Sequence, residues 1–392
     1  MTGDGPLICI VTGEPSGDLL GARLMTALTR ATSGRARFMG VGGESMQAQG
    51  LDSLADQSEF AVMGFVEVVP KAARILRRVR EIADAIAEAK PDVMITVDSW
   101  GFTGRLNRAV RARALGIPQI HYVAPMVWAW KERRAVGVAA TVDHLLCLLP
   151  NEPPYFERHG LACTHVGHPV VEGGAGRGDA AAFRASHGIP PDAPLLCVLP
   201  GSRRTETGRL LPVFATALGR LRVRFPNLHV VAPTVATVAA DVERAAHGWP
   251  VPTIVVRGEA ARYDAFAAAD AAMAASGTVG LELALAGVPH LVAYKVSAFS
   301  AWLLRRLVKV RYVNLVNLAL DRPVVPELLQ EACTGAALAA MVERLLTDEV
   351  LRTAQRSAFA EASQQLAGGP GNPSDRAAAV VLRILGQEET AP

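Results

Sequence analysis

The chain alternates short apolar, largely β-branched runs with longer stretches of helical periodicity. The apolar runs are 4–8 residues long, which is the length of buried strands rather than helices. The predicted strands are residues 7–12 (LICIVT), 92–98, 119–123, 144–149, 195–200, 227–233, 253–258 and 271–276. Unbroken apolar strands separated by helices are typical of parallel sheets covered on both faces. The sequence therefore predicts an α/β protein.

Two series of these strands are separated by the glycine-rich stretch 171–182 (VEGGAGRGDAAA). We expect an N-terminal domain over residues 1–170 and a C-terminal domain over 171–365, each with its own sheet. A second break, LAGGPGNPSD, precedes the predicted helix of the tail, 366–392, with Ser374 as its N-cap. We expect this helix to pack on the N-terminal domain or on a partner subunit. A homodimer is therefore one of the possible assemblies.

Composition excludes several classes of protein. Half of the residues are apolar, a fifth are charged and the net charge is +3, which argues against disorder and against a dedicated nucleic-acid binder. The five cysteines form no C-x-x-C pair, and most lie in apolar runs, which predicts buried thiols in a reducing cytosol. No secretory signal or transmembrane run is predicted. Residues 163–168 (CTHVGH) match no standard zinc spacing, so no metal is expected.

Ligands of such folds bind where the loops follow the carboxyl ends of the strands. The first loop, TGEPSGD (12–18), combines glycines with Ser16 and Asp18, and backbone N–H groups there could face an anion or a sugar; simple helix capping is the alternative. In the second, Asp98 ends an apolar strand beside Trp100. A carboxylate in such a place can serve as a general base, or it can cap the following helix.

Two loops of the second half carry groups suited to a diphosphate. Ser202 and Arg203, in LPGSRRTE (199–206), can donate hydrogen bonds to phosphate oxygens. The turn Ser276-Gly277-Thr278 precedes a helix that contains Glu282 among leucines and alanines. A carboxylate there requires a partner, which a ribose or Arg203 could supply; compensation of the helix dipole is the plainer alternative.

With these residues assembled, the chain resembles the lipid-A-disaccharide synthase family over nearly its whole length. The resemblance lies in GEPSGDLLGA (13–22), GVGGESMQAQG (40–50), MGFVEVVP (63–70), YVAPMVWAWKERR (122–134), GHP (167–169), LPGSRRTE (199–206), SGTVGLELALAGVP (276–289) and YVNLVNL (312–318). It implies the GT-B architecture, two Rossmann-like doubly wound domains facing across a cleft.

The family implies an inverting transfer of diacylglucosamine from UDP-2,3-diacylglucosamine to 2,3-diacylglucosamine 1-phosphate, with a new β-1,6 bond and release of UDP. It implies that Asp98 is the base. No cofactor is expected, because the sequence contains no Asp-x-Asp pair that could hold Mg²⁺ against a diphosphate. The implied UDP contacts are Ser202, Arg203, Ser276, Gly277, Thr278, Glu282 and Asn317, and the implied acceptor contacts are Glu14, Gly17 and Asp18. One departure is Gly101, which stands where the family commonly has a second acidic residue, so a mechanism that needs that carboxylate could not apply.

Both substrates carry acyl chains, so the enzyme is expected at the anionic surface of the inner membrane, on its cytoplasmic side. Residues 301–313 (AWLLRRLVKVRYV) interleave leucines and Trp302 with Arg305, Arg306 and Lys309 and contain no acidic residue. Residues 63–80 are similar in style, and a core helix with snorkelling arginines is an alternative for both. The rival enzymatic function is another UDP-sugar enzyme of this architecture, such as a UDP-N-acetylglucosamine 2-epimerase. A non-catalytic lipid-binding protein is less consistent with Asp98, Arg203 and Glu282.

Overall fold

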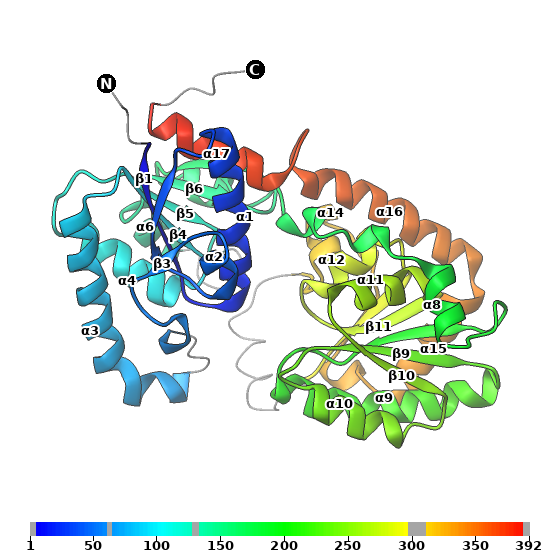
Figure 1. The fold of residues 1–392 in the computed structure, drawn as a ribbon. Helices are drawn as coiled ribbons and strands as arrows, with labels where there is room; N and C mark the ends of the chain where they lie inside the picture. Colours follow the sequence, from blue (N-terminus) through cyan, green and yellow to red (C-terminus); the bar gives the residue numbers. More distant parts are fainter. Residues whose placement is uncertain (1–4, 61–64, 128–132, 297–310, 387–392) are drawn as a thin grey trace. The chain divides into compact units, whose positions relative to one another are not determined.

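The computed structural model describes residues 5–60, 65–127, 133–296 and 311–386, and within these the side chains of Ser58 and residues 65–73 are not described. The chain divides into two compact units. The N-terminal unit is Met1–Pro169 with Ala367–Pro392, and the C-terminal unit is Val170–Leu366. Each is built on a parallel sheet with helices on both faces (Figure 1).

The sheet of the N-terminal unit has the strand order β3-β2-β1-β4-β5-β6-β7, and all of its pairings are parallel. The strands are β1 (Leu7–Thr12), β2 (Arg37–Val41), β3 (Asp52–Ser53), β4 (Val93–Val97), β5 (Gln119–Tyr122), β6 (His144–Cys147) and β7 (Ala162–His165). Beginning at β1, the chain builds outward to β3 and then resumes on the other side at β4. The carboxyl ends of β1 and β4 therefore form a topological switch point, where doubly wound folds bind ligands.

The C-terminal unit repeats this arrangement in the order β10-β9-β8-β11-β12-β13, again fully parallel. Its strands are β8 (Leu195–Leu199), β9 (His229–Thr234), β10 (Thr253–Arg257), β11 (Ala271–Ala275), β12 (His290–Tyr294) and β13 (Glu327–Leu329). Its switch point lies between β8 and β11. Both orders follow the Rossmann pattern, so the predicted fold of two Rossmann-like units is confirmed.

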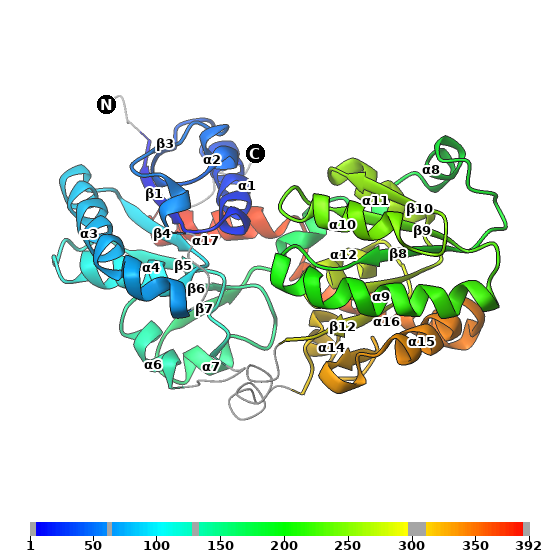
Figure 2. The same ribbon diagram turned by 90° about the horizontal axis from the view of Figure 1, so that it is seen from below.

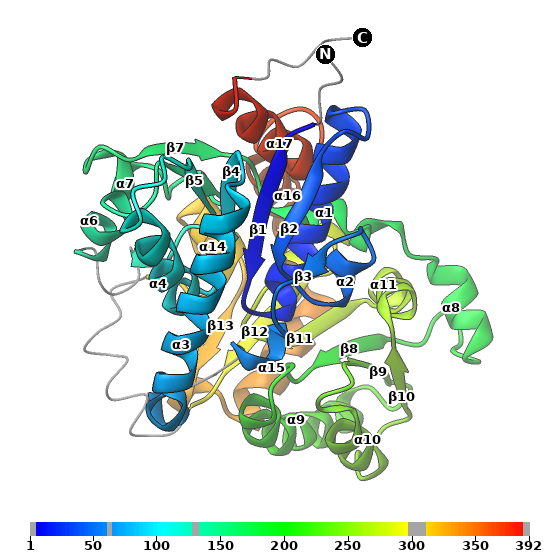
Figure 3. The same ribbon diagram turned by 60° about the vertical axis from the view of Figure 1, so that its left-hand side comes forward.

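Successive side chains along each strand point to opposite faces of the sheet and pack into two hydrophobic cores, one on each face. In β1, Ile8 and Ile10 pack with helices α1 (Pro15–Ala31) and α17 (Pro373–Ile384), whereas Cys9 and Val11 pack with α3 (Phe65–Ala89) and α4 (Trp100–Arg111) (Figure 3). In the C-terminal unit, α9 (Arg204–Arg224), α10 (Ala239–His247) and α15 (Gly335–Thr347) cover one face. The other face is covered by α8 (Ala180–Ser186), α11 (Glu259–Ala268) and α12 (Val279–Leu285).

Among the described residues, the remaining helices of four or more residues are α2 (Glu44–Gln47), α6 (Arg134–Ala139), α7 (Pro154–Glu157), α14 (Leu315–Leu320) and α16 (Glu349–Ala367). Short 3-10 turns lie at Gln57–Glu59, Pro169–Glu172, Ala175–Arg177 and Gln330–Ala332.

The C-terminal helix α17 lies beside α1 within the N-terminal unit, as Figures 1 and 2 show. Ala377, Val380 and Val381 are buried there in the core shared with β1 and α1. The prediction that Ser374 caps this helix is wrong: Asn372 occupies the N-cap position and Ser374 lies buried inside the first turn. The Asn-Pro pair starts the helix two residues earlier, because proline is well suited to the first helical position.

Several other sequence predictions are tested by the fold. The eight predicted strands are present, whereas β2, β3, β7, β12 and β13 were not predicted. No disulfide forms, and of the five cysteines only Cys163 is partly exposed. No helix among the described residues is long and apolar enough to cross a membrane.

Candidate active site

Asp98 follows β4 at the switch point of the N-terminal unit, and its backbone conformation is strained. Asp98 and Ser99 both have positive φ angles, 53° and 45°, which cost non-glycine residues of the order of 1 kcal/mol each or more. The Asp98 carboxylate accepts a hydrogen bond from the Ser99 N–H (2.7 Å), and its carbonyl accepts one from the Thr103 hydroxyl (2.7 Å). The side chain is half-buried. A carboxylate held this way at a strand end is suited to contact a ligand.

The alternative in which Asp98 caps the following helix is wrong. The N-cap residue of α4 is Ser99, and neither its side chain nor that of Asp98 accepts from the N–H groups of the first helical turn. The strain at Asp98 and Ser99 therefore has no compensation from capping. Strained positions of this kind cluster at functional sites.

A buried polar network lies behind Asp98. Thr96 on β4 contacts the Nδ1 atom of His121 on β5 at 2.8 Å, and Asn107 of α4 donates to the Thr96 hydroxyl at 2.9 Å. The ring of Trp100 meets that of His121 edge-on, with 4.7 Å between the centroids. Burial lowers the pKa of His121 to about 3, so this ring is neutral near pH 7. The patterns at the strand ends do not point to His121, although a histidine inside an otherwise apolar strand is a local signal of a buried polar contact.

The loop after β1 contacts the loop after β4. A Cβ atom placed on Gly13 would lie 3.1 Å from the Cβ of Ser99 and 3.0 Å from the Phe102 ring. Gly17 lies as close to the sheet, because its Cβ would be 3.4 Å from the carbonyl oxygen of Val97. These glycines allow the first two candidate loops to meet at one edge of the sheet.

Asp18 has a structural task in this loop region. Its buried carboxylate accepts hydrogen bonds from the N–H groups of Gly43 (2.7 Å), Ser45 (2.8 Å) and Met46 (3.1 Å), at the start of α2. The neighbouring Glu14 is half-buried, and its carbonyl accepts from the Asp18 N–H (3.0 Å). Asp18 thus fixes α2 onto α1 and has little acceptor capacity left for a ligand.

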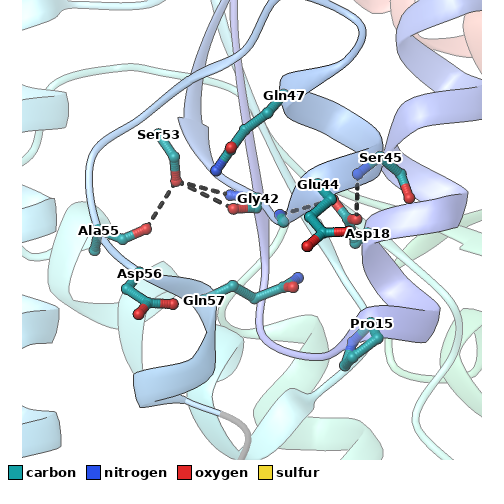
Figure 4. Close-up of a pocket in the computed structure, with 11 residues that line it drawn as sticks. Pro15, Asp18, Gly42, Glu44, Ser45, Gln47, Ser53, Ala55, Asp56 and Gln57 are labelled. Atoms are coloured by element: carbon teal, nitrogen blue, oxygen red, sulfur yellow. Dashed lines mark hydrogen bonds between the residues drawn. The ribbon is translucent and has the colours of Figure 1, made fainter. Parts of the chain in front are cut away.

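A cavity of about 630 Å³ opens beside Asp18 (Figure 4). It lies between the start of α1, the β2–α2 loop and the segment after β3. The residues that line it are Pro15, Asp18, Gly42, Gly43, Glu44, Ser45, Gln47, Ser53, Ala55, Asp56 and Gln57. Glu14 and Gly17 are not among them. No local sequence pattern points to Gln57, because its role depends on a contact with Thr12 of β1.

In the C-terminal unit, the loops after β8 and β11 lie side by side. Gly201 has a φ angle of 106°, and a Cβ on it would lie 3.4 Å from the Cβ of Ala275 at the end of β11. Ser202 and Arg203 follow and are exposed. Arg203 forms an ion pair with Glu206 (3.2 Å), and 54% of the Arg203 side chain remains accessible. The loop thus presents a hydroxyl and a guanidinium next to the end of β11.

The turn after β11 is open at its tip. Ser276 is half-buried and its hydroxyl donates to the Val313 carbonyl (3.3 Å), while Gly277 and Thr278 are exposed. The structure therefore brings Ser202, Arg203, Ser276, Gly277 and Thr278 to the switch point of one sheet.

Glu282 has a protein partner, which is Arg262 of α11. Their Nη2 and Oε1 atoms are 3.1 Å apart, and the side chains are 26% and 17% exposed. The suggestion that Arg203 would be the competing partner is wrong, because Arg203 pairs with Glu206 in the adjacent loop. The plainer alternative, in which Glu282 only compensates a helix dipole, does not account for this ion pair.

Asn317 does not fit the direct ligand contact that the resemblance implied. It is fully buried, and its amide nitrogen donates to the carbonyl of Val325 (2.8 Å) and to Glu327 (2.9 Å). Its oxygen accepts from the N–H groups of Val324 and Val325. All four hydrogen-bonding positions of the amide are occupied, so Asn317 orders the segment before β13.

The remaining predictions concern the two basic, apolar segments proposed to face the membrane and the absence of a metal site. Trp302, Arg305, Arg306 and Lys309 lie outside the described residues. In α3, Arg74 and Arg78 pair with Glu59, and Val79 and Ile82 are buried, so its later half is a core helix with charged surface residues. Among the described residues no group of three His, Cys, Asp or Glu side chains could hold a metal ion.

Two Rossmann-like units, each with polar loops at its switch point, define a class of two-domain, doubly wound α/β proteins. Solved structures agree on the fold. A Staphylococcus aureus MnaA–UDP co-structure aligns over 99% of both chains with a TM-score of 0.69 and 15% identity. Acinetobacter baumannii MurG aligns over 97% of this chain and 99% of its own with a TM-score of 0.58 and 13% identity. These likenesses place the fold among GT-B proteins.

Comparison with related sequences shows the family to which the chain belongs. The family model described as lipid-A-disaccharide synthetase matches residues 8–372. The lipid-A-disaccharide synthase of Paramagnetospirillum magneticum is 52% identical over 97% of this chain and 98% of its own length, and that of Rhodospirillum centenum is 51% identical over 97% and 94%. The chain belongs to the lipid-A-disaccharide synthase family and is therefore a glycosyltransferase of lipid A synthesis.

Proposed function

We propose that the enzyme transfers diacylglucosamine from UDP-2,3-diacylglucosamine to the 6-hydroxyl of 2,3-diacylglucosamine 1-phosphate. The family match over residues 8–372 supports the reaction. The single structural observation that carries the mechanism is the half-buried, strained Asp98 at the switch point.

In this mechanism Asp98 accepts the proton of the acceptor hydroxyl. The hydroxyl oxygen forms its bond to the anomeric carbon while the bond from that carbon to the UDP oxygen breaks, and the electron pair leaves with UDP. One displacement from the opposite face inverts the anomeric centre and gives the β-1,6 bond. A positioned base contributes about 10²–10⁴-fold to such a step. Because Gly101 carries no carboxylate, Asp98 acts without a second acid at that position.

The UDP moiety is assigned to the C-terminal unit. Arg203 is placed at the end of β8 to neutralise a diphosphate, and its exposure leaves it free to exchange Glu206 for phosphate oxygens. The exposed Gly277 and Thr278 supply backbone and hydroxyl donors, with Ser202 and Ser276 alongside. Glu282 is the proposed acceptor of the ribose hydroxyls, and its ion pair with Arg262 positions the carboxylate. Preorganised donors of this kind stabilise a leaving diphosphate without a divalent metal.

Of the acceptor residues that the resemblance implied, Glu14 is retained as a contact, whereas Gly17 and Asp18 act by holding the loop. The enzyme works at the anionic surface of the inner membrane, where the basic, leucine-rich segment 301–313 is the proposed docking element. A homodimer is compatible with this scheme.

The test is to incubate the purified protein with both lipid substrates and to measure release of UDP and formation of the disaccharide. We expect UDP and the disaccharide to form in equal amounts. The same activity should persist in the presence of excess chelator. Conversion of UDP-N-acetylglucosamine alone, with no disaccharide from the lipid pair, would instead favour the epimerase alternative. Loss of activity on chelation that Mg²⁺ restores would contradict the metal-free mechanism.

A further inference from the structure

We propose that the cavity beside α2 binds the uncharged hydroxyl and amide groups of the acceptor sugar, and neither its phosphate nor its acyl chains. This inference rests on the proposed function. It specifies which chemical groups of the acceptor bind in this cavity. Its volume of about 630 Å³ lies within the roughly 300–1,000 Å³ of small-molecule pockets.

Gln57 gives the cavity a fixed hydrogen-bond acceptor. The side chain is only 8% exposed, and its nitrogen donates to the Glu14 carbonyl (3.0 Å) and to the Thr12 hydroxyl. A carbonyl oxygen can only accept, so this contact sets the orientation of the amide. The amide oxygen has no partner among the described residues, and Figure 4 shows the Gln57 side chain extending toward Asp18 and Glu44. An oriented acceptor that faces the cavity is suited to bind a donor such as a sugar hydroxyl or amide N–H.

The charge of the lining excludes a phosphate. None of the eleven lining residues is Arg, Lys or His, while Glu44 and Asp56 add carboxylates at the rim. The Asp18 carboxylate is already taken up by three backbone N–H groups. Carboxylates accept hydrogen bonds and bind hydroxyl donors strongly, whereas their juxtaposition with a phosphate is repulsive.

The side chains of the lining favour polar sugar groups over acyl chains. Apart from the glycines, only Pro15 and Ala55 present purely apolar side chains to the cavity. Gln47 and Ser45 add a donor amide and a hydroxyl. Hydrocarbon placed here would desolvate polar groups without returning hydrogen bonds.

The cavity is connected to Asp98 through the sheet. Gln57 is bonded to Thr12, and Thr12 pairs in register with Val97, the residue before Asp98. The loop from Thr12 continues into Gly13, which contacts Ser99. A sugar ring held by its hydroxyls in this cavity therefore lies at the same sheet edge as the proposed base.

The decisive experiment is acceptor kinetics of Glu44→Ala and Gln47→Ala, with Glu157→Ala at an exposed position of α7 as the matched control. Glu44 and Gln47 are exposed at the rim, and no hydrogen bond within the described residues depends on their side chains. We expect the acceptor KM to rise about tenfold in Glu44→Ala, the scale of one hydrogen bond to a charged group. The donor KM and kcat should stay at the parent values.

Two further measurements separate the possible outcomes. The rise should be equal for acceptors with and without the 1-phosphate, and free N-acetylglucosamine, but not inorganic phosphate, should shift the amide NMR signals of residues 42–47. An unchanged acceptor KM in both variants, or a response to inorganic phosphate, would overturn the proposal while leaving the transferase function intact. Absence of transfer by the parent enzyme would contradict the proposed transferase function. The NMR titration with N-acetylglucosamine would then still test whether the cavity binds a sugar.

Discussion

Arg262 of α11 donates a hydrogen bond to Glu282 of α12, with 3.1 Å between the Arg262 Nη2 and the Glu282 Oε1. Both side chains are mostly buried, so the ion pair holds the carboxylate in one place. Removing one member of a partly buried pair leaves the other charge uncompensated. The pair therefore connects the proposed ribose contact to the packing of the C-terminal unit.

Replacing Glu282 with alanine should weaken UDP binding by about 1–3 kcal/mol, since a carboxylate that accepts ribose hydroxyls is lost. Isothermal titration calorimetry of UDP with the parent and Glu282→Ala measures this directly. Arg262→Ala is the control for the ion pair, and it should cost less affinity because the ribose acceptor remains. Unaltered UDP affinity in a folded Glu282→Ala protein would rule out the ribose contact.

Asp98→Asn should lower single-turnover disaccharide formation by about 10²–10⁴-fold at saturating substrates, because asparagine keeps the shape and cannot accept the proton. UDP binding should be nearly unchanged. Asparagine tolerates positive φ angles well, so the strained loop should persist and the melting temperature should stay close to that of the parent. A rate close to that of the parent would assign the base to another residue.

Asp18→Ala should destabilise the N-terminal unit by about 1–3 kcal/mol, because backbone N–H groups at the start of α2 lose their acceptor. Urea unfolding, followed for the transition of that unit, measures the loss. The exposed Asp52→Ala serves as the comparison and should be nearly neutral. If Asp18→Ala instead raised the acceptor KM at unchanged stability, direct acceptor binding would be the better assignment.

Burial lowers the pKa of His290 to about 4, below the value of about 6.5 expected in the unfolded chain. Between these values the unfolded state binds more protons than the folded state, so stability falls as the pH drops from about 6.5 toward 4. One such group contributes up to about 1.4 kcal/mol per pH unit.

The melting temperature of His290→Gln should consequently depend less on pH over that window than that of the parent, even if the lost ring contact with Phe359 lowers it at neutral pH. The exposed His159→Gln should retain the pH dependence of the parent. Identical pH profiles for His290→Gln and the parent would show that His290 does not contribute.

Reversing Arg305 and Arg306 to glutamate should reduce co-sedimentation with anionic liposomes at low salt, since each basic residue near such a surface contributes about 1 kcal/mol. Turnover of a soluble short-chain substrate should persist. The matched control reverses Arg220 and Arg222, which are exposed on α9. Equal sedimentation of the Arg305/Arg306 variant and the parent would count against membrane docking through this segment.

The strands whose residues are uniformly apolar were predictable from the sequence, because a strand buried on both faces leaves a local signature. The ends of those strands, with Asp98, Arg203 and the Ser276 turn, were predictable for the same reason. Strands such as β7 (Ala162–His165), which is half-exposed at the sheet edge, lack that signature and were missed. The family resemblance added roles that local patterns could not supply.

The sequence by itself determined the two α/β units and the residues at their strand ends, since both follow from short-range periodicity. Only the tertiary structure decided how each polar group is used. Asp18 is held by backbone N–H groups far along the chain, and Asn317 by backbone groups and Glu327 across a loop. Glu282 is paired with Arg262, twenty residues away. The physical reason is that a buried polar group must be satisfied, and its partner is whichever donor or acceptor the fold brings within about 3 Å.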